Sequence, residues 1–140
     1  MLSARPLSPG NATGELLLLD APLSFWGGMD RATGQVIDPH HPQHGFSLAG
    51  KIVAMPSGRG SSSSSSVLAE AIRAGCAPAA LILGYLDGII ALGAMVAGEL
   101  YGRHHPVVFL EDGAYRTLRS GMQVRVVAGD EEAAVELLPG

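Results

Sequence analysis

A segment rich in glycine and serine, "PSGRGSSSSSS" from Pro56 to Ser66, holds the residues best suited to chemistry. Glycine lets a backbone approach a ligand closely, and Arg59 can grip a carboxylate or phosphate through two hydrogen bonds. If the segment leads into a helix, the free N–H groups of the first helical turn strengthen such a site. The segment therefore predicts an anion-binding site, and a serine-rich helix cap without chemistry is the alternative.

Two other interpretations of this segment are disfavoured. A Walker-type phosphate loop needs Gly-Lys-Ser or Gly-Lys-Thr at its end, and the segment contains no lysine. A flexible linker would divide the chain into residues 1–56 and 67–140, and both pieces would be near the lower limit for a stable core. We therefore expect one domain over residues 1–140.

Composition excludes several classes of function. Cys76 is the only cysteine, so the chain cannot form an internal disulfide or hold an iron–sulfur cluster by itself. A net charge of -4 argues against a nucleic-acid partner. The longest apolar stretch is too short to span a membrane, and no signal peptide is apparent, so we expect a cytoplasmic protein without membrane contact.

Apolar periodicity predicts the elements that position this segment. A buried strand over 51–55 precedes the serines, and an amphipathic helix follows them, with apolar residues from Val67 to Ile72 and Gly75 at its end. The pattern predicts further strands at 15–19, 34–37, 79–83, 106–110, 123–127 and 133–138, a buried helix over 87–97 and a short helix over 113–120. Strands that alternate with helices, bracketed by antiparallel strands, predict an α/β domain with a mixed sheet.

Other polar residues have simpler interpretations. Three histidines in a Pro-rich loop, His40, His41 and His44, lack a carboxylate partner at a fixed spacing, so no metal site is assigned to them. Asp30 and Asp38 flank turns, where carboxylates commonly bond to their own backbone.

Three segments together resemble the small, swivelling-domain subunit of the aconitase X family: "PLSFWGGMDRATGQVIDPHHPQHG", "SLAGKIVAMPSGRGSSSSSS" and "APAALILGYLDGIIALGAMVAGE". The resemblance implies a swivelling β/β/α fold and a dehydratase whose active site is shared with a large subunit. It also implies that the large subunit, and not this chain, holds an iron or iron–sulfur centre. Phe25 and Trp26 would then contact the large subunit or line the cleft between the subunits. This chain departs from many relatives at position 40, where histidine replaces arginine.

The resemblance also assigns residue roles. The family's Gly-Ser-Ser loop matches Gly60, Ser61 and Ser62, which makes Ser61 the expected catalytic base, with Ser62 as the alternative. Arg59 would orient a substrate carboxylate. The remaining hydrogen bonds to the substrate would come from the side chains or amides of Ser57, Gly58, Gly60 and Ser62.

Two substrates are associated with the family, cis-3-hydroxy-L-proline and mevalonate 5-phosphate. The chain has a single lysine and no basic cluster around Arg59, which favours the substrate without a phosphate. An interpretation of another class also stays open: a non-catalytic domain that binds anions or assists assembly.

Overall fold

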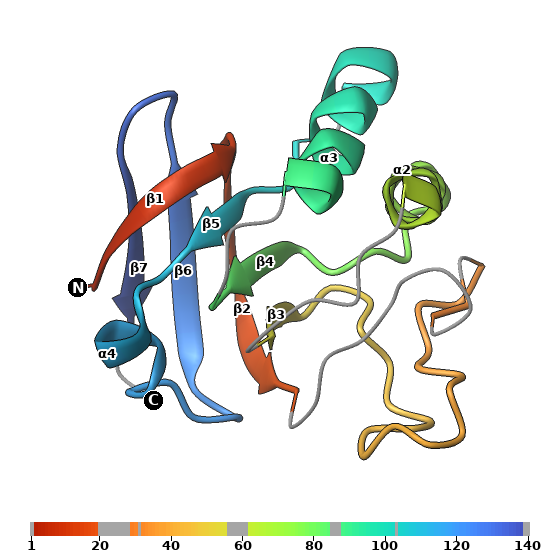
Figure 1. Cartoon of the computed structure of the whole chain (residues 1–140), viewed down its shortest axis with the longest axis horizontal. Helices are drawn as coiled ribbons and strands as arrows, with labels where there is room; N and C mark the ends of the chain where they lie inside the picture. The colour runs from red at the N-terminus through yellow and green to blue at the C-terminus, as the bar shows by residue number, and fades with distance from the viewer. Residues whose placement is uncertain are drawn as a thin grey trace.

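Seven strands close into a barrel, with two long helices packed outside it (Figure 1). The computed structural model describes residues 2–19, 29–30, 32–55, 62–84, 88–102 and 104–138, and only the backbone at 62–67 and 88–91. The strands are β1 (Leu2–Ser8), β2 (Gly10–Leu18), β3 (Ile52–Met55), β4 (Ala80–Leu83), β5 (Val107–Phe109), β6 (Gln123–Ala128) and β7 (Ala133–Leu137). The helices are α2 (Ser62–Ala74), α3 (Gly88–Tyr101) and α4 (Asp112–Tyr115). None of them is long and apolar enough to cross a bilayer.

Half of the barrel is parallel and half is antiparallel. The strands β2, β3, β4 and β5 run parallel, in register from Leu16 against Ile52 to Ile82 against Val108. The helices α2 and α3 supply the crossovers between β3, β4 and β5 that parallel pairing requires. The strands β6 and β7 form an antiparallel hairpin, and β1 joins β7 to β5. The predicted α/β fold with a mixed sheet is thus confirmed.

The parallel strands are buried on both faces. Val53 and Met55 of β3 pack toward the helices, whereas Ile52 and Ala54 face the barrel interior. This double burial explains why β3 and β4 are short continuous apolar runs. In β6, by contrast, buried and exposed residues alternate, because only one face is covered.

Several sequence-based boundaries need correction. The strand β1 was not predicted, since Arg5 and Pro6 interrupt its apolar pattern. Residues 34–37 form no strand, but contribute only isolated bridges at Gln35 and Val36. The helix predicted over 113–120 is the single turn α4, because Thr117 and Leu118 bond back in tighter turns to Ala114 and Tyr115.

Candidate functional site

The carboxyl ends of three adjacent parallel strands, β2, β3 and β4, lie at one edge of the sheet. The segments that contain the predicted site residues and Phe25–Trp26 follow two of these strands. Residue 20 follows β2 after Leu19, residue 56 follows β3 directly, and residue 85 follows β4 after Gly84. Ligands of α/β sheets typically bind outside the carboxyl ends of parallel strands. The fold therefore starts all three segments from the edge where a binding site is expected.

Most of the predicted site residues lie outside the described residues. This holds for Ser57, Gly58, Arg59, Gly60 and Ser61, and also for Phe25 and Trp26. Their assigned roles therefore stay predictions. The structure describes the two elements that flank the Pro56–Ser61 segment, β3 before it and α2 after it.

Backbone hydrogen bonds fix the ends of the strands at this edge. Three bonds extend the ladder beyond the strands: Leu19 N–H donates to Ala54 O, Gly84 N–H to Met55 O, and Leu110 N–H to Leu83 O, each at 2.9 Å. The side chains of Leu19, Met55 and Leu83 at this edge are at most 1% exposed. Strand ends that are bonded and buried in this way hold the following segments at defined starting points.

The helix α2 begins at Ser62, so Ser62 is the first helical residue after the Pro56–Ser61 segment. Ser62–Ser66 are helical, which corrects the prediction that the serines form a loop before the helix. The apolar period starts only at Val67, and serine is a moderate helix former that packing of the next turns readily recruits. Leu68, Ala71 and Ile72 provide that packing, because all three are buried.

The N-terminus of helix α2 directly follows the Pro56–Ser61 segment in the chain. A helix of 13 residues places free N–H groups and a partial positive charge at this end. The opposite end of α2 has features typical of a solvent-exposed helix end. Gly75, which follows the helix, has φ +80°, and Arg73 in the last turn pairs with Glu70. The arrangement favours a negative group at the start of α2.

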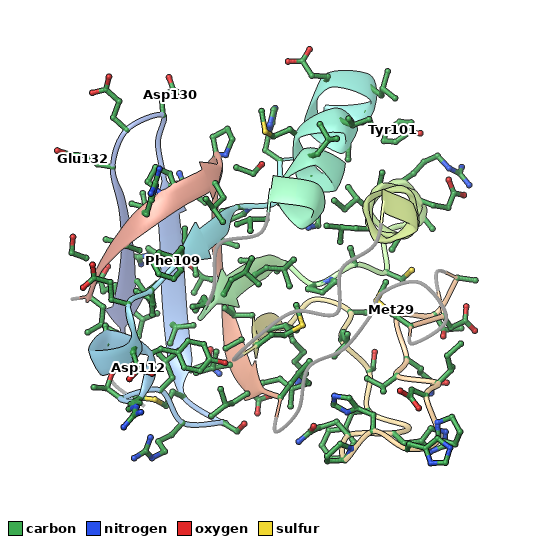
Figure 2. The ribbon with its side chains drawn as sticks, in the orientation of Figure 1. Met29, Tyr101, Phe109, Asp112, Asp130 and Glu132 are labelled. Carbon is green, nitrogen blue, oxygen red and sulfur yellow. The ribbon has the colours of Figure 1, made fainter. Side chains whose placement is uncertain are left out.

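A hollow that sequence reasoning missed lies beside the end of the neighbouring strand β5. It has a volume of about 430 Å³ and contains Arg5 and Glu111, besides Ser3, Ala4, Phe109, Gly113 and Ala114. Arg5 of β1 is directly opposite Phe109 of β5 in the pairing register, and Figure 2 labels Phe109 where the two strands run together. No sequence signal linked Arg5 to this edge, because its strand was not predicted.

The histidine-rich excursion between β2 and β3 is organised by its own turns. The His41 side chain is buried, and its Nδ1 accepts a hydrogen bond from Gln43 N–H at 3.0 Å. Oδ1 of Asp30 and Oδ1 of Asp38 accept from backbone N–H groups two residues ahead, at 2.8 and 2.9 Å, so the structural interpretation of both aspartates is confirmed.

Metal-binding side chains do not gather in the part of the chain that the structure describes. Within it, no three His, Cys, Asp or Glu residues are placed to hold an ion. Cys76 follows the end of α2 and is buried, with its Sγ 3.7 Å from Ala71 O. This burial raises the pKa of its thiol. A thiol that resists ionisation is a poor metal ligand.

Comparison with known proteins agrees with this architecture. Residues 1–136 match the family model described as the aconitase X swivel domain. A cis-3-hydroxy-L-proline dehydratase of Pseudomonas aeruginosa is 51% identical over 110 residues, 79% of this chain but only 19% of the relative, so the chain spans about a fifth of that protein. A phosphomevalonate dehydratase small subunit of Thermococcus gammatolerans is 38% identical, covering 99% of this chain and 98% of the relative. The crystal structure of Thermococcus kodakaraensis aconitase X in its holo-form superposes with a TM-score of 0.84 at 38% identity, covering 99% of this chain and 98% of that one.

Proposed function

The chain belongs to the aconitase X swivel domain family, and we propose that its 140 residues act as the small subunit of an aconitase-like hydro-lyase. In this proposal a large subunit completes the active site, and the enzyme dehydrates a hydroxylated carboxylic acid. The observation that carries the proposal is the match to the family over residues 1–136, on a fold that starts the Pro56–Ser61 segment at the carboxyl edge of its parallel strands.

We assign the chemistry of this subunit to the segment between Met55 and Ser62. Ser61 is proposed to remove the proton from the carbon next to the substrate carboxylate, as the family pattern implies. Arg59 holds that carboxylate through two charge-assisted hydrogen bonds. Ser57 and Ser62, with the amides of Gly58 and Gly60, complete the hydrogen bonding, and the N-terminus of α2 stabilises the negative charge that develops.

The iron or iron–sulfur centre is assigned to the large subunit. The donor set of this chain does not suit it, since the single thiol, Cys76, is buried with a raised pKa. When bound, such a centre supplies Lewis-acid assistance to departure of the substrate hydroxyl. A cytoplasmic location is part of the same proposal, because a chain with a single cysteine needs no disulfide of its own and suits a reducing compartment.

We propose cis-3-hydroxy-L-proline as the substrate, with mevalonate 5-phosphate as the alternative. A phosphorylated substrate would benefit from cations beyond Arg59. The only lysine, Lys51, precedes the amino end of β3, opposite the proposed site, and its Nζ lies 2.6 Å from Glu15 Oε2. This lysine is therefore poorly placed to bind a phosphate near Arg59. The relative with 51% identity is named for the hydroxyproline reaction, although two-chain relatives are named for the phosphomevalonate reaction.

Co-expression with the large subunit of the same organism tests the proposal. The purified complex is assayed for loss of water from cis-3-hydroxy-L-proline and from mevalonate 5-phosphate. We expect turnover of the first substrate. Turnover of the second alone would replace the substrate assignment, whereas a stable complex that turns over neither would favour an anion-binding or assembly domain.

A further inference from the structure

The helix α3 presents large apolar side chains to solvent and buries small ones. Leu92, Met95 and Leu100 are 53%, 48% and 67% exposed, and Val96 is exposed as well. These four residues, which we call the α3 face, follow the i, i+3, i+4, i+8 spacing of one helical stripe. This arrangement corrects the prediction of a buried helix. It is also the reverse of a typical surface helix, which buries its large apolar side chains and exposes polar ones.

Close packing explains the buried side of α3. Ala94 and Ala97 pack into the core, and Gly98 lies so close to the His104 ring that an added Cβ would be 2.7 Å from Nδ1. The small residues therefore let the helix approach the barrel, and the large ones remain outside. The fold needs the buried side, but the fold does not use the α3 face.

The neighbouring helix α2 shows what a solvent-facing helix of this chain looks like. Its outer residues include Glu70 and Arg73, which pair with each other. Next to the α3 face lies one exposed charged residue, Glu99, between Val96 and Leu100 in the sequence, while Tyr101 at the end of α3 projects on the side of α2 (Figure 2). An exposed apolar stripe of this kind marks an interaction surface.

The size of the α3 face argues for an occupant that also covers other surface. From their exposed fractions, the four side chains offer roughly 400 Å², whereas a standard stable interface takes about 800 Å² from each partner. A second copy seated on this face alone would bury too little. A larger partner that extends to an adjoining surface would bury enough.

The start of the helix is close in the chain to such a surface, the carboxyl edge of the parallel strands. The helix α3 begins at Gly88, soon after β4 ends at Leu83, so its first turn is next to the carboxyl edge of the sheet. In the proposed function, a large subunit covers that edge. Since this inference rests on the proposed function, it names the partner of the same site.

We propose that the α3 face docks against the large subunit of the dehydratase, through an apolar surface with a cationic side chain opposite Glu99. The apolar contact supplies the affinity, because it removes the stripe from water. The cation is required because a carboxylate buried without a partner would oppose binding. Docking along α3 would also hold the Pro56–Ser61 segment against the partner, since α2 packs on α3.

The test compares complexes of the large subunit with three forms of this chain: wild type, Met95→Lys/Leu100→Lys, and the control Val127→Lys. Val127 is an exposed apolar residue of β6, in the antiparallel hairpin away from α3 (Figure 1). Calorimetry is expected to give a Kd at least about 100-fold weaker for the double variant and within threefold of wild type for the control. Leu100→Ser provides a milder second variant, expected to weaken binding about tenfold, and a thermal melt of each free chain verifies folding.

Hydrogen exchange on the wild-type complex gives an independent readout, with protection expected over residues 92–101 and not over 123–137. A double variant that binds as well as wild type, or a face that stays unprotected, would overturn the inference. So would a wild-type dimer of the free chain that the double variant abolishes without any change in large-subunit binding. An assembled complex without dehydratase activity would instead contradict the proposed function and leave the docking surface standing.

Discussion

At the scale of single residues, the proposed chemistry depends on a basic problem: a serine hydroxyl is a weak base. Ser61 directly precedes the first helical residue of α2, so the free N–H groups of that helix are near in sequence. A helix N-terminus and the Arg59 cation both favour negative charge, which lowers the free energy of an alkoxide. The proposed role of Ser61 therefore depends on its place directly before α2 as well as on its hydroxyl.

Replacing Ser61 by alanine tests this role. In the complex with the large subunit, we expect Ser61→Ala to lower kcat by at least about 100-fold with little change in KM, because a general base acts in the chemical step. Ser62→Ala is the matched control and should lose less, with the double variant measured to detect substitution of one serine for the other. A nearly normal kcat in Ser61→Ala, together with a free energy of unfolding lowered by roughly 1 kcal/mol, would instead identify Ser61 as a helix cap.

Arg59 is expected to act in binding and not in the chemical step. A guanidinium grips a carboxylate with two parallel hydrogen bonds, which the ammonium of lysine cannot reproduce. Arg59→Lys should therefore raise KM at least tenfold, as expected when a paired contact of about 2 to 5 kcal/mol is weakened. Steady-state kinetics of the complex measures this change, and an unchanged KM would remove Arg59 from the site.

Cys76 gives a prediction about pH. Burial raises the pKa of its thiol above the ordinary value, so the folded chain resists forming the thiolate. At pH 8, an aromatic disulfide reagent should react much more slowly with the folded chain than with the chain in urea. The raised folded-state pKa also means that the unfolded state ionises first, so this group's contribution to stability is lost as pH rises above about 9. Equal reaction rates in the two states would show that the thiol is accessible.

At the scale of elements, sequence reasoning located the central strands well and the edges poorly. The continuous apolar runs of β3, β4 and β5 were predicted because burial on both faces leaves no polar position in them. The strand β1 alternates partly buried and exposed residues around Arg5, a signal too weak to see without its partners β5 and β7. The pattern located α3 but misjudged its surroundings, since its composition is apolar on both sides.

The candidate site was predictable to a similar, partial degree. The segment Pro56–Ser66 was singled out from composition, and the structure describes the strand β3 before it and the helix α2 that includes its last residues. The start of α2 was predicted too late in the sequence, because the buried side chains that stabilise Ser62–Ser66 as helix belong to later turns. Arg5 was missed because only the pairing of β1 with β5 brings it next to Phe109.

In the segment over residues 32–51, Gly34 lies tightly against the backbone that follows α2. Gly34 has φ +79°, and a Cβ there would lie 2.3 Å from the backbone O of Cys76. Gly34→Ala should destabilise the fold by on the order of 3 kcal/mol or more, by backbone strain and by this contact. Gly45→Ala is the matched control, since Gly45 has φ +87° with open space around it, and should cost only about 1 to 2 kcal/mol. Urea denaturation measures both, and equal losses would mean that the Cys76 carbonyl gives way.

At the scale of the whole molecule, the barrel is closed by two strands that each join its parallel and antiparallel halves. The strand β2 pairs in parallel with β3 and antiparallel with β6, and β1 pairs with β5 and β7. Among the described strands, closure gives every strand a neighbour on both sides, and separate apolar clusters fill the barrel and the space under the helices. The fold thus has a core of its own, while its carboxyl edge and α3 face are the surfaces that we propose for a partner.

This division predicts that the isolated chain folds but does not catalyse. Its single, buried thiol does not suit the proposed iron or iron–sulfur centre, and half of the proposed cleft would belong to the large subunit. A cooperative thermal transition of the purified chain should therefore accompany an absence of dehydratase activity.

Titrating the chain into a fixed amount of iron-loaded large subunit should raise turnover to a plateau at equimolar ratio, with iron remaining in the complex by elemental analysis. The Ser61→Ala chain should compete for the large subunit with the same stoichiometry and suppress turnover. Activity from the purified chain alone, or turnover by the large subunit that the chain does not increase, would contradict the shared active site.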